Sequence, residues 1–334
     1  MRKQMAKRWC VAVVLICLLS SGAQAASQRL VPLGVPAGVR MTAAGVVVSA
    51  MTAVDSPAGE SCPGEQAGLE AGDILQTANG TALRSGEQLA QLVRDSGGSP
   101  IRFTGLRGQT DIAVSVQPVK SRATGAYQIG ILVRDSMAGI GTLTYADPES
   151  GVFGALGHPV SDVDSGALLP LDSGSIVPAQ VVGVVVGETG TPGELIGTYA
   201  FSRELGTLDD NTACGIFGTL TDRTLCDAET METAEKEDIH TGAAQLLCCV
   251  AGDTPARYDI VIEKVDADAA DGRSLRLRVT DPALLETTGG IVPGMSGSPI
   301  IQDGKLIGAV THVLVNDPAR GYGIFIEDML EAAG

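Results

Sequence analysis

The residues with the clearest chemical potential lie near the end of the chain, in the segment Gly294-Met-Ser-Gly-Ser-Pro299. Ser296 stands there between glycines, which permit a tight turn that lifts its hydroxyl away from the neighbouring strands. The same turn leaves the backbone N–H groups of Gly294 and Ser296 free to face one point. Such a pair of donors forms an oxyanion hole, which stabilises a transition state by about 3–4 kcal/mol. The pattern therefore predicts a nucleophilic serine at Ser296, with an oxyanion hole formed by Gly294 and Ser296.

A serine hydroxyl needs a general base near neutral pH, and the chain has only three histidines. His158 follows an apolar, strand-like segment and stands in a Gly-Pro turn, so it is the predicted base. It lies far enough upstream of Ser296 for two structural units to contribute one partner each. His240 follows an acidic run and is expected at the surface. His312 ends the hairpin after Ser296; we expect it near the cleft, as a weaker candidate for the base.

The third member of a triad, an acid that orients the histidine, is not fixed by spacing. Asp162 and Asp164 are too local to His158 in sequence to be favoured, although Asp162 is within reach. Four aspartates occupy the usual position in chain order, between base and nucleophile: Asp209, Asp210, Asp222 and Asp227. Asp281 precedes Ser296 at the end of a predicted strand, where a surface Asp-Pro turn is the alternative interpretation. The residues alone leave these choices open.

The elements that must position these residues are predicted to be short strands. From Ala126 onwards, apolar segments alternate with Gly, Pro and Asp turns, which is typical of a barrel, a sandwich or two small barrels. The 334 residues give room for roughly two domains. Hydrophobic residues make up 44% of the chain, enough for buried cores, and the 43 glycines favour turns and strands over long helices.

The N-terminal segment has a different composition from the rest. Arg2, Lys3, Lys7 and Arg8 precede an apolar run from 9 to 19, and an Ala-Gln-Ala sequence ends at Ala25. This arrangement is typical of a secretory signal, and the run is shorter than the ~20 residues that span a bilayer. Residues 1–25 are therefore predicted to be a signal peptide, or a signal anchor if uncleaved, and the protein is expected to act outside the cytoplasm. The formal net charge of −16 argues against a nucleic acid partner.

No metal or cofactor is expected. The chain has seven cysteines, of which Cys10 and Cys17 lie in the leader. The sequence contains no Cys-x-x-Cys pair and no His/Cys cluster with the spacing of zinc ligands. A Cys214–Cys226 bridge fits the spacing, but burial of both as small apolar side chains is the preferred interpretation.

Residues 33–120 resemble a bacterial PDZ domain. The resemblance rests on the run Ala67-Gly-Leu-Glu-Ala-Gly-Asp-Ile-Leu75, on the Asn79-Gly80 hairpin turn and on a capped helix from Ser85 to Asp95. PDZ domains take an extended peptide as an added strand beside a sheet edge. The resemblance implies a groove between a Gly-apolar loop and the second helix, lined by Gly38, Val39, Met41, Leu89 and Val93. The alternative is that these five residues belong to the core.

The loop at Ser296 and its following hairpin resemble the nucleophile loop of chymotrypsin-like serine proteases. Longer segments resemble the stage IV sporulation protein B peptidase family: GHPVSD, TDPALLETTGGIVPGMSGSPIIQDGKLIGAVTHVLVNDP and GYGIFIEDML. This second resemblance implies a His-Asp-Ser protease at His158, Asp281 and Ser296, although Asp281 comes later in the chain than the acid of most chymotrypsin-like enzymes. The implied fold is mainly β, with an N-terminal α+β PDZ domain and a chymotrypsin-like double β-barrel at 126–334.

The family resemblance also implies a biological role. Such proteases are exported by the forespore into the space between the two spore membranes, and they cleave themselves. They then cut the extracytoplasmic part of a membrane regulator that restrains an intramembrane metalloprotease, which leads to processing of a late sporulation sigma factor. The implied partners are this protein substrate, the chain itself and a peptide ligand of the PDZ domain.

Two other functions remain as alternatives. One is a non-catalytic PDZ adaptor with an inactive protease-like scaffold, against which the residues around Ser296 and His158 argue. The other is a degradative protease. HtrA-like enzymes carry the PDZ domain after the protease, whereas here it comes first, which disfavours that reading.

Overall fold

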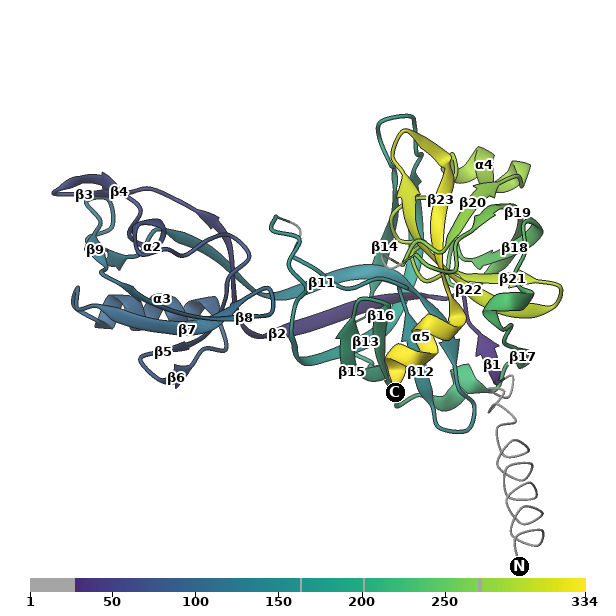
Figure 1. The fold of residues 1–334 in the computed structure, drawn as a ribbon, viewed down its shortest axis with the longest axis horizontal. Helices are drawn as coiled ribbons and strands as arrows, with labels where there is room; N and C mark the ends of the chain where they lie inside the picture. Colours follow the sequence, from purple (N-terminus) through teal and green to yellow (C-terminus); the bar gives the residue numbers. More distant parts are fainter. Residues whose placement is uncertain (1–27, 163, 201, 270–271) are drawn as a thin grey trace, which may run out of the picture.

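The protein is described from a computed structural model, which places residues 28–334 except 163, 201 and 270–271. The predicted leader, residues 1–25, lies outside the described residues. The described chain is mainly β-structure, with a PDZ-like unit at one end and two barrels packed together at the other (Figure 1). The prediction of a mainly β chain with a PDZ-like unit and a double-barrel protease is confirmed. None of the described helices is both long enough and apolar enough to cross a membrane.

Six strands close the first barrel, because each pairs with the next and the last returns to the first. In ring order they are β2 (Pro36–Met51), β11 (Ile131–Ala146), β12 (Val152–Ala155), β16 (Gly215–Leu220), β15 (Gly206–Thr212) and β13 (Leu171–Val185). Three strands flank the ring: β1 (Arg29–Pro32), β14 (Glu194–Tyr199) and β17 (Met231–Glu232). Fully buried Leu143, Phe153 and Ile176 fill the interior. Burying these side chains supplies the main favourable free energy for closing the ring.

The second barrel is also closed by six strands. In ring order they are β18 (Gly242–Cys248), β19 (Ala256–Val265), β20 (Leu275–Val279), β23 (Asp317–Phe325), β22 (Lys305–Leu314) and β21 (Pro299–Gln302). The same part of the chain also contains α4 (Pro282–Thr288), α5 (Ile326–Ala333) and the 3-10 helix η2 (Lys236–Asp238). The 3-10 helix η1 (Arg223–Cys226) packs on the first barrel, where Arg223 donates to the Pro148 carbonyl. β18 buries Ala244, Leu246 and Cys248 and turns the residues between them outward, as a strand with one buried face must.

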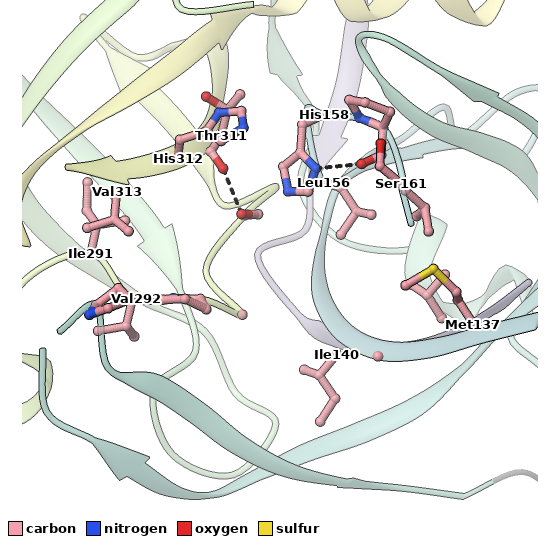
Figure 2. Close-up of a pocket in the computed structure, with 18 of the residues that line it drawn as sticks. Met137, Ile140, Leu156, His158, Ser161, Ile291, Val292, Thr311, His312 and Val313 are labelled. Carbon is pink, nitrogen blue, oxygen red and sulfur yellow. Dashed lines mark hydrogen bonds between the residues drawn. The ribbon is translucent and has the colours of Figure 1, made fainter. Parts of the chain in front are cut away.

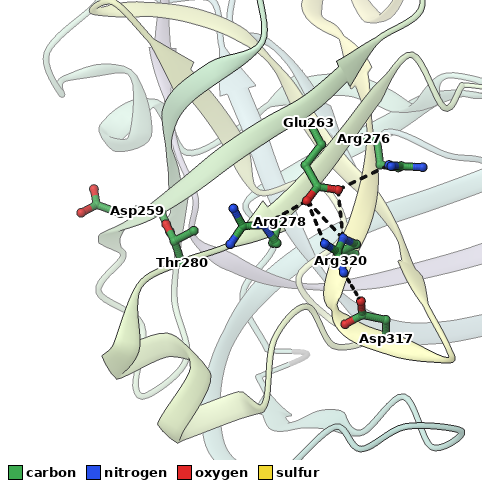
Figure 3. A network of polar contacts seen from close by, with 7 residues as sticks. All are labelled: Asp259, Glu263, Arg276, Arg278, Thr280, Asp317 and Arg320. Carbon is green, nitrogen blue, oxygen red and sulfur yellow. Dashed lines mark hydrogen bonds and ion pairs between the residues drawn. The ribbon is translucent and has the colours of Figure 1, made fainter.

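A charged network on the outside of the second barrel ties three of its strands together (Figure 3). Glu263 on β19 accepts hydrogen bonds from Arg278 Nε on β20 and Arg320 Nε on β23, both at 2.9 Å. Arg276 pairs with the same carboxylate, and Arg320 also binds Asp317. The hydrogen bond from Arg320, opposed by burial and helped by Arg278, lowers the pKa of Glu263. The carboxylate therefore stays ionised under mildly acidic conditions and keeps the strands joined.

The PDZ-like unit has its own core. Its elements are β3 (Val54–Ser56), β4 (Gly59–Ser61), α2 (Pro63–Gln66), β5 (Ile74–Ala78), β6 (Thr81–Ala82), α3 (Gly86–Asp95), β7 (Ile101–Arg107), β8 (Thr110–Val116), β9 (Val119–Lys120) and β10 (Tyr127–Gln128). The predicted cap of α3 is confirmed, since Ser85 Oγ accepts from Gln88 N. The predicted hairpin turn is also present, because Asn79 and Gly80 both have positive φ between β5 and β6.

The boundary between the two domains differs from the expected division into 33–120 and 126–334. β2 and β11 are 16 residues long each, and they pair from Met51 with Ile131 to Pro36 with Thr142. One half of this ladder belongs to the first barrel and the other half to the PDZ-like unit (Figure 1). The PDZ-like unit is thus inserted into the first barrel, because a strand that precedes it and a strand that follows it are neighbours there.

Candidate active site

A cleft of about 820 Å³ lies between the barrels, and both His158 and Ser296 line it. Figure 2 shows this cleft with His158 on one side and Thr311 and His312 on the other. The first barrel contributes β2, β11 and the turn that carries His158. The second contributes the Ser296 loop and the end of β22, including His312 as expected. Most of the remaining lining is apolar: Val39, Met41, Met137, Ile140, Leu156, Val160, Ile291, Val292, Val313 and Val315. The cleft therefore suits an uncharged stretch of polypeptide.

The Ser296 loop is held from the opposite barrel. Thr142 on β11 donates its N–H to the Ser296 carbonyl at 3.0 Å and its hydroxyl to the Gly294 carbonyl at 2.9 Å. Thr144 Oγ1 donates to the Gly297 carbonyl at 2.7 Å. Among the described residues, no partner accepts a hydrogen bond from the N–H of Gly294 or Ser296. The two donors predicted to form the oxyanion hole are therefore available, and their role in catalysis stays a prediction.

The hydroxyl of Ser296 is engaged by a backbone carbonyl. Ser296 Oγ donates to the Thr311 carbonyl at 2.8 Å, the contact dashed beside Thr311 in Figure 2. The register of β22 against β23 shifts between Val310 and His312, so Thr311 lies at a bulge. Bulges redirect backbone groups next to active sites, as this one does. Because a carbonyl cannot remove the proton, this is a resting conformation of the hydroxyl.

His158 is presented by a tight turn after β12. Leu156 and Gly157 precede it with φ values of 69° and 70°. His158 Nδ1 lies 2.9 Å from the Pro159 carbonyl, which can only accept, so Nδ1 carries the proton and the Nε2 lone pair is free. Burial lowers the pKa of His158, and the Pro159 contact opposes this shift only in part. The imidazole is therefore neutral at neutral pH, as a general base must be.

The structure does not bring Asp281 to His158. One carboxylate oxygen of Asp281 accepts from the N–H of Ala283 and Leu284 at the start of α4, and the other from Asp259 N at 3.3 Å. Asp281 is absent from the cleft lining, and Pro159 already accepts from His158 Nδ1. The triad role implied by the family resemblance is thus not the arrangement found here. Asp281 followed by proline at the first helical position is instead a helix cap.

The other acids considered also have different partners. Asp162 lines the cleft, but its carboxylate accepts from Ser165 N and Oγ and from Arg134 Nη1. Asp164 pairs with Arg134 at 2.7 Å. Further candidates bind neighbouring groups: Asp209 accepts from Thr219, and Asp222 caps η1. No carboxylate in the described ranges hydrogen-bonds His158.

The residues predicted to line the PDZ groove separate into two sets. Leu89 and Val93 of α3 line a groove of about 410 Å³ in the PDZ-like unit, as expected. Gly38, Val39 and Met41 are misassigned: they lie on the barrel half of β2, where Val39 and Met41 line the cleft between the barrels.

The other wall of this groove comes from residues 126–133, and Thr52 to Val54 also line it. The sequence signal for that wall is the apolar run Ile129-Gly-Ile-Leu-Val133, which lies inside the range 126–334 predicted for the protease. Because the PDZ-like unit is inserted, its groove strand comes after its helices rather than before them.

The described residues hold no group of three His, Cys, Asp or Glu side chains that is arranged to bind a metal ion. The five cysteines among them are all free, Cys214 and Cys226 included.

Comparison with protein families gives two matches. Residues 125–330 match SpoIVB peptidase S55, and residues 54–107 match a PDZ domain. The chain belongs to the SpoIVB peptidase S55 family. It is a serine endopeptidase that carries a PDZ domain.

Solved structures resemble parts of this S55 peptidase. The PDZ domain of the SdrC-like protein from Listeria monocytogenes is 20% identical with a TM-score of 0.23, covering 28% of this chain and 90% of that one. A protease from M. tuberculosis in its active form is 12% identical with a TM-score of 0.37, covering 59% and 75%. The HtrA-type protease AlgW with a decapeptide is 15% identical with a TM-score of 0.35, covering 60% and 52%. No curated protein matches this S55 peptidase.

Proposed function

We propose that this peptidase cleaves peptide bonds with Ser296 as nucleophile and His158 as general base. The observation that carries the proposal is that the two side chains, one from each barrel, line a single cleft. Rotation of the Ser296 hydroxyl away from the Thr311 carbonyl frees its proton for His158 Nε2. The hydroxyl oxygen then attacks the substrate carbonyl, and the N–H groups of Gly294 and Ser296 stabilise the oxyanion. His158 passes its proton to the departing amine, and water completes hydrolysis in a second round.

The Pro159 carbonyl takes the part that an acid plays in a triad. By accepting from His158 Nδ1, it fixes the tautomer in which Nε2 is basic, and it holds the ring in place. A carbonyl dipole stabilises the imidazolium less than a full carboxylate charge does. In this proposal the enzyme works with a Ser-His dyad, and its rate of acylation is expected to be modest.

In the cell, we propose that the enzyme is exported, cleaves itself and then cuts the extracytoplasmic part of a membrane regulator. That cut relieves an intramembrane metalloprotease and allows processing of a late sporulation sigma factor. Family membership and the secretory character of residues 1–25 support this proposal. The site of action is the space between the forespore membranes.

The experiment compares wild type with Ser296→Ala in a sporulating host that lacks its own enzyme. Wild type is expected to shorten itself and restore sigma-factor processing, and the variant is expected to do neither. Restoration by Ser296→Ala would instead identify the chain as a non-catalytic adaptor. Self-shortening without restored processing would leave the peptidase intact and refute the signalling role.

A further inference from the structure

One strand connects the PDZ groove to the catalytic cleft. Residues 131–133 at the start of β11 line the groove, and residues 137–140 of the same strand line the cleft. One edge of β11 pairs with β2 on both sides of Asp135, and the register shifts at that residue. Among the described residues, no other element hydrogen-bonds the backbone of residues 131–141. The second edge of β11 is therefore open from the groove to the cleft.

This open edge is accessible to another chain. Leu132 is 56% exposed, and Ala138 and Gly139 are exposed as well. A Cβ built on Gly139 meets no atom within 4 Å, so the space beside it is empty. Edge strands with unpaired N–H and C=O groups accept extended peptides as an added strand.

The far end of the groove is suited to a chain terminus. Within the described ranges, the N–H groups of Ile129 and Gly130 donate to no acceptor. Gly130 has φ of 73°, and a Cβ there would lie 2.6 Å from the Thr52 carbonyl, so glycine is needed for this turn. Arg94 lines the same groove at the end of α3. Consecutive free N–H groups with a guanidinium nearby bind a carboxylate.

The start of α3 lies at the end of the groove that is nearer the cleft, where it is joined to β11. α3 begins beside Asp135, whose Oδ2 accepts from Gly86 N, and its C-terminal end lies near Tyr127, which is in contact range of Gly98. A peptide whose C-terminal carboxylate sits at residues 129–130 therefore runs past the start of α3. Its preceding residues then follow β11 toward residues 137–140.

We propose that the groove and the cleft are the two ends of one substrate track along β11. Preferred substrates are polypeptides with a free, apolar C-terminal residue and a scissile bond about ten residues upstream, because nine steps of about 3.3 Å separate Ile131 from Ile140. The apolar side chains that line both ends favour uncharged residues at the terminus and near the cut. This inference rests on the proposed peptidase function and adds to it a rule for choosing substrates.

The test uses a mixture of peptides about 30 residues long that end in Val, Leu or Ile, made once as free acids and once as C-terminal amides. Mass spectrometry gives the distance of each cut from the C-terminus. With free acids, cuts are expected to cluster about 9–12 residues from the end, at rates at least about tenfold above those of amides. Cuts that show no preferred distance, or that are equally fast in amides, overturn the track.

Variants separate docking from chemistry. Leu132→Asp places a charge on an exposed groove residue, and Val182→Asp makes the same change at a side chain that is 60% exposed and outside both sites. Leu132→Asp is expected to lose the clustering. Val182→Asp is expected to keep it and to cut a tail-free decapeptide at the wild-type rate.

Three outcomes are decisive. If a separate peptide carrying only the apolar tail accelerates cutting of the amides, the groove activates the enzyme at a distance, and the single track is refuted. If wild type cuts no peptide of either kind, the proposed peptidase function fails together with the track. If free acids and amides are both cut without a preferred distance, only the substrate track is refuted and the peptidase function stands.

Discussion

Gly297 is the point at which the nucleophile loop touches the first barrel, and replacing it with alanine separates site geometry from stability. A Cβ on Gly297 would lie 2.1 Å from the Thr142 carbonyl and 2.5 Å from Leu156 N. Both contacts are backbone atoms, so the Ser296 loop, or β11 and the turn before His158, must move by about 1 Å. A displacement of that size in a catalytic group costs on the order of 10² in rate.

Gly304 provides a matched control in the hairpin that follows. Its φ of 78° is close to the 95° of Gly297, but a Cβ there meets no atom within 4 Å. Alanine at either position has a conformational cost of about 1–2 kcal/mol, and only Gly297→Ala adds the clash. Gly304→Ala is therefore expected to lower stability slightly and to leave the rate unchanged.

The assay is the rate at which a fluorophosphonate acylates Ser296, measured beside urea unfolding of each variant. Gly297→Ala is expected to react about 100-fold more slowly than Gly304→Ala under conditions in which both remain folded. Equal rates for two folded variants would show that the contact between the barrels does not set the position of Ser296.

Three further outcomes are expected. Because burial lowers the pKa of His158, the acid limb of kcat/KM should lie below pH 6.5, and a limb above 6.5 would contradict a desolvated base. Protonating this histidine also costs the folded state more than the unfolded state, so its contribution to stability falls as pH drops below 6.5. Thr142→Val removes the hydrogen bond to the Gly294 carbonyl and should slow acylation about fivefold, from a loss of about 1 kcal/mol, with little change in melting temperature. Asp281→Ala should lower the unfolding free energy by about 1 kcal/mol, whereas Asp281→Asn should not, because asparagine still caps α4. If Asp281→Asn is fully stable but its rate of peptide cleavage collapses, the Asp281 carboxylate must instead reach His158 during catalysis.

Short sequence motifs predicted those parts of the site whose conformation depends on only a few neighbouring residues. The glycines around Ser296 and the turn before His158 act within a few residues, so their pattern was enough to bring both residues into one predicted cleft. The Ser85 cap and the Asn79-Gly80 turn were predictable for the same reason. Each of these features is determined by the conformational preferences of neighbouring residues.

The features that depended on distant pairing were not predictable. Nothing in the run of small residues around Met41 indicates that half of β2 leaves the PDZ domain and joins a barrel closed by β13. Because of this pairing, Val39 and Met41 line the cleft between the barrels and not the peptide groove in which they were predicted. The same pairing also placed the true groove strand at residues 129–133, after the helices. The backbone carbonyl that faces His158 Nδ1 is likewise set by the folded turn, and the residue types in the sequence do not indicate which carbonyl it is.

The most direct measurement of the central claim is the site of fluorophosphonate attachment on the purified chain, read by mass spectrometry. We predict a single adduct on Ser296, formed by wild type, slowed by orders of magnitude in His158→Ala and absent from Ser296→Ala. An adduct on another serine, or labelling of Ser296 at an unchanged rate without the His158 imidazole, would contradict a peptidase that works through these two residues.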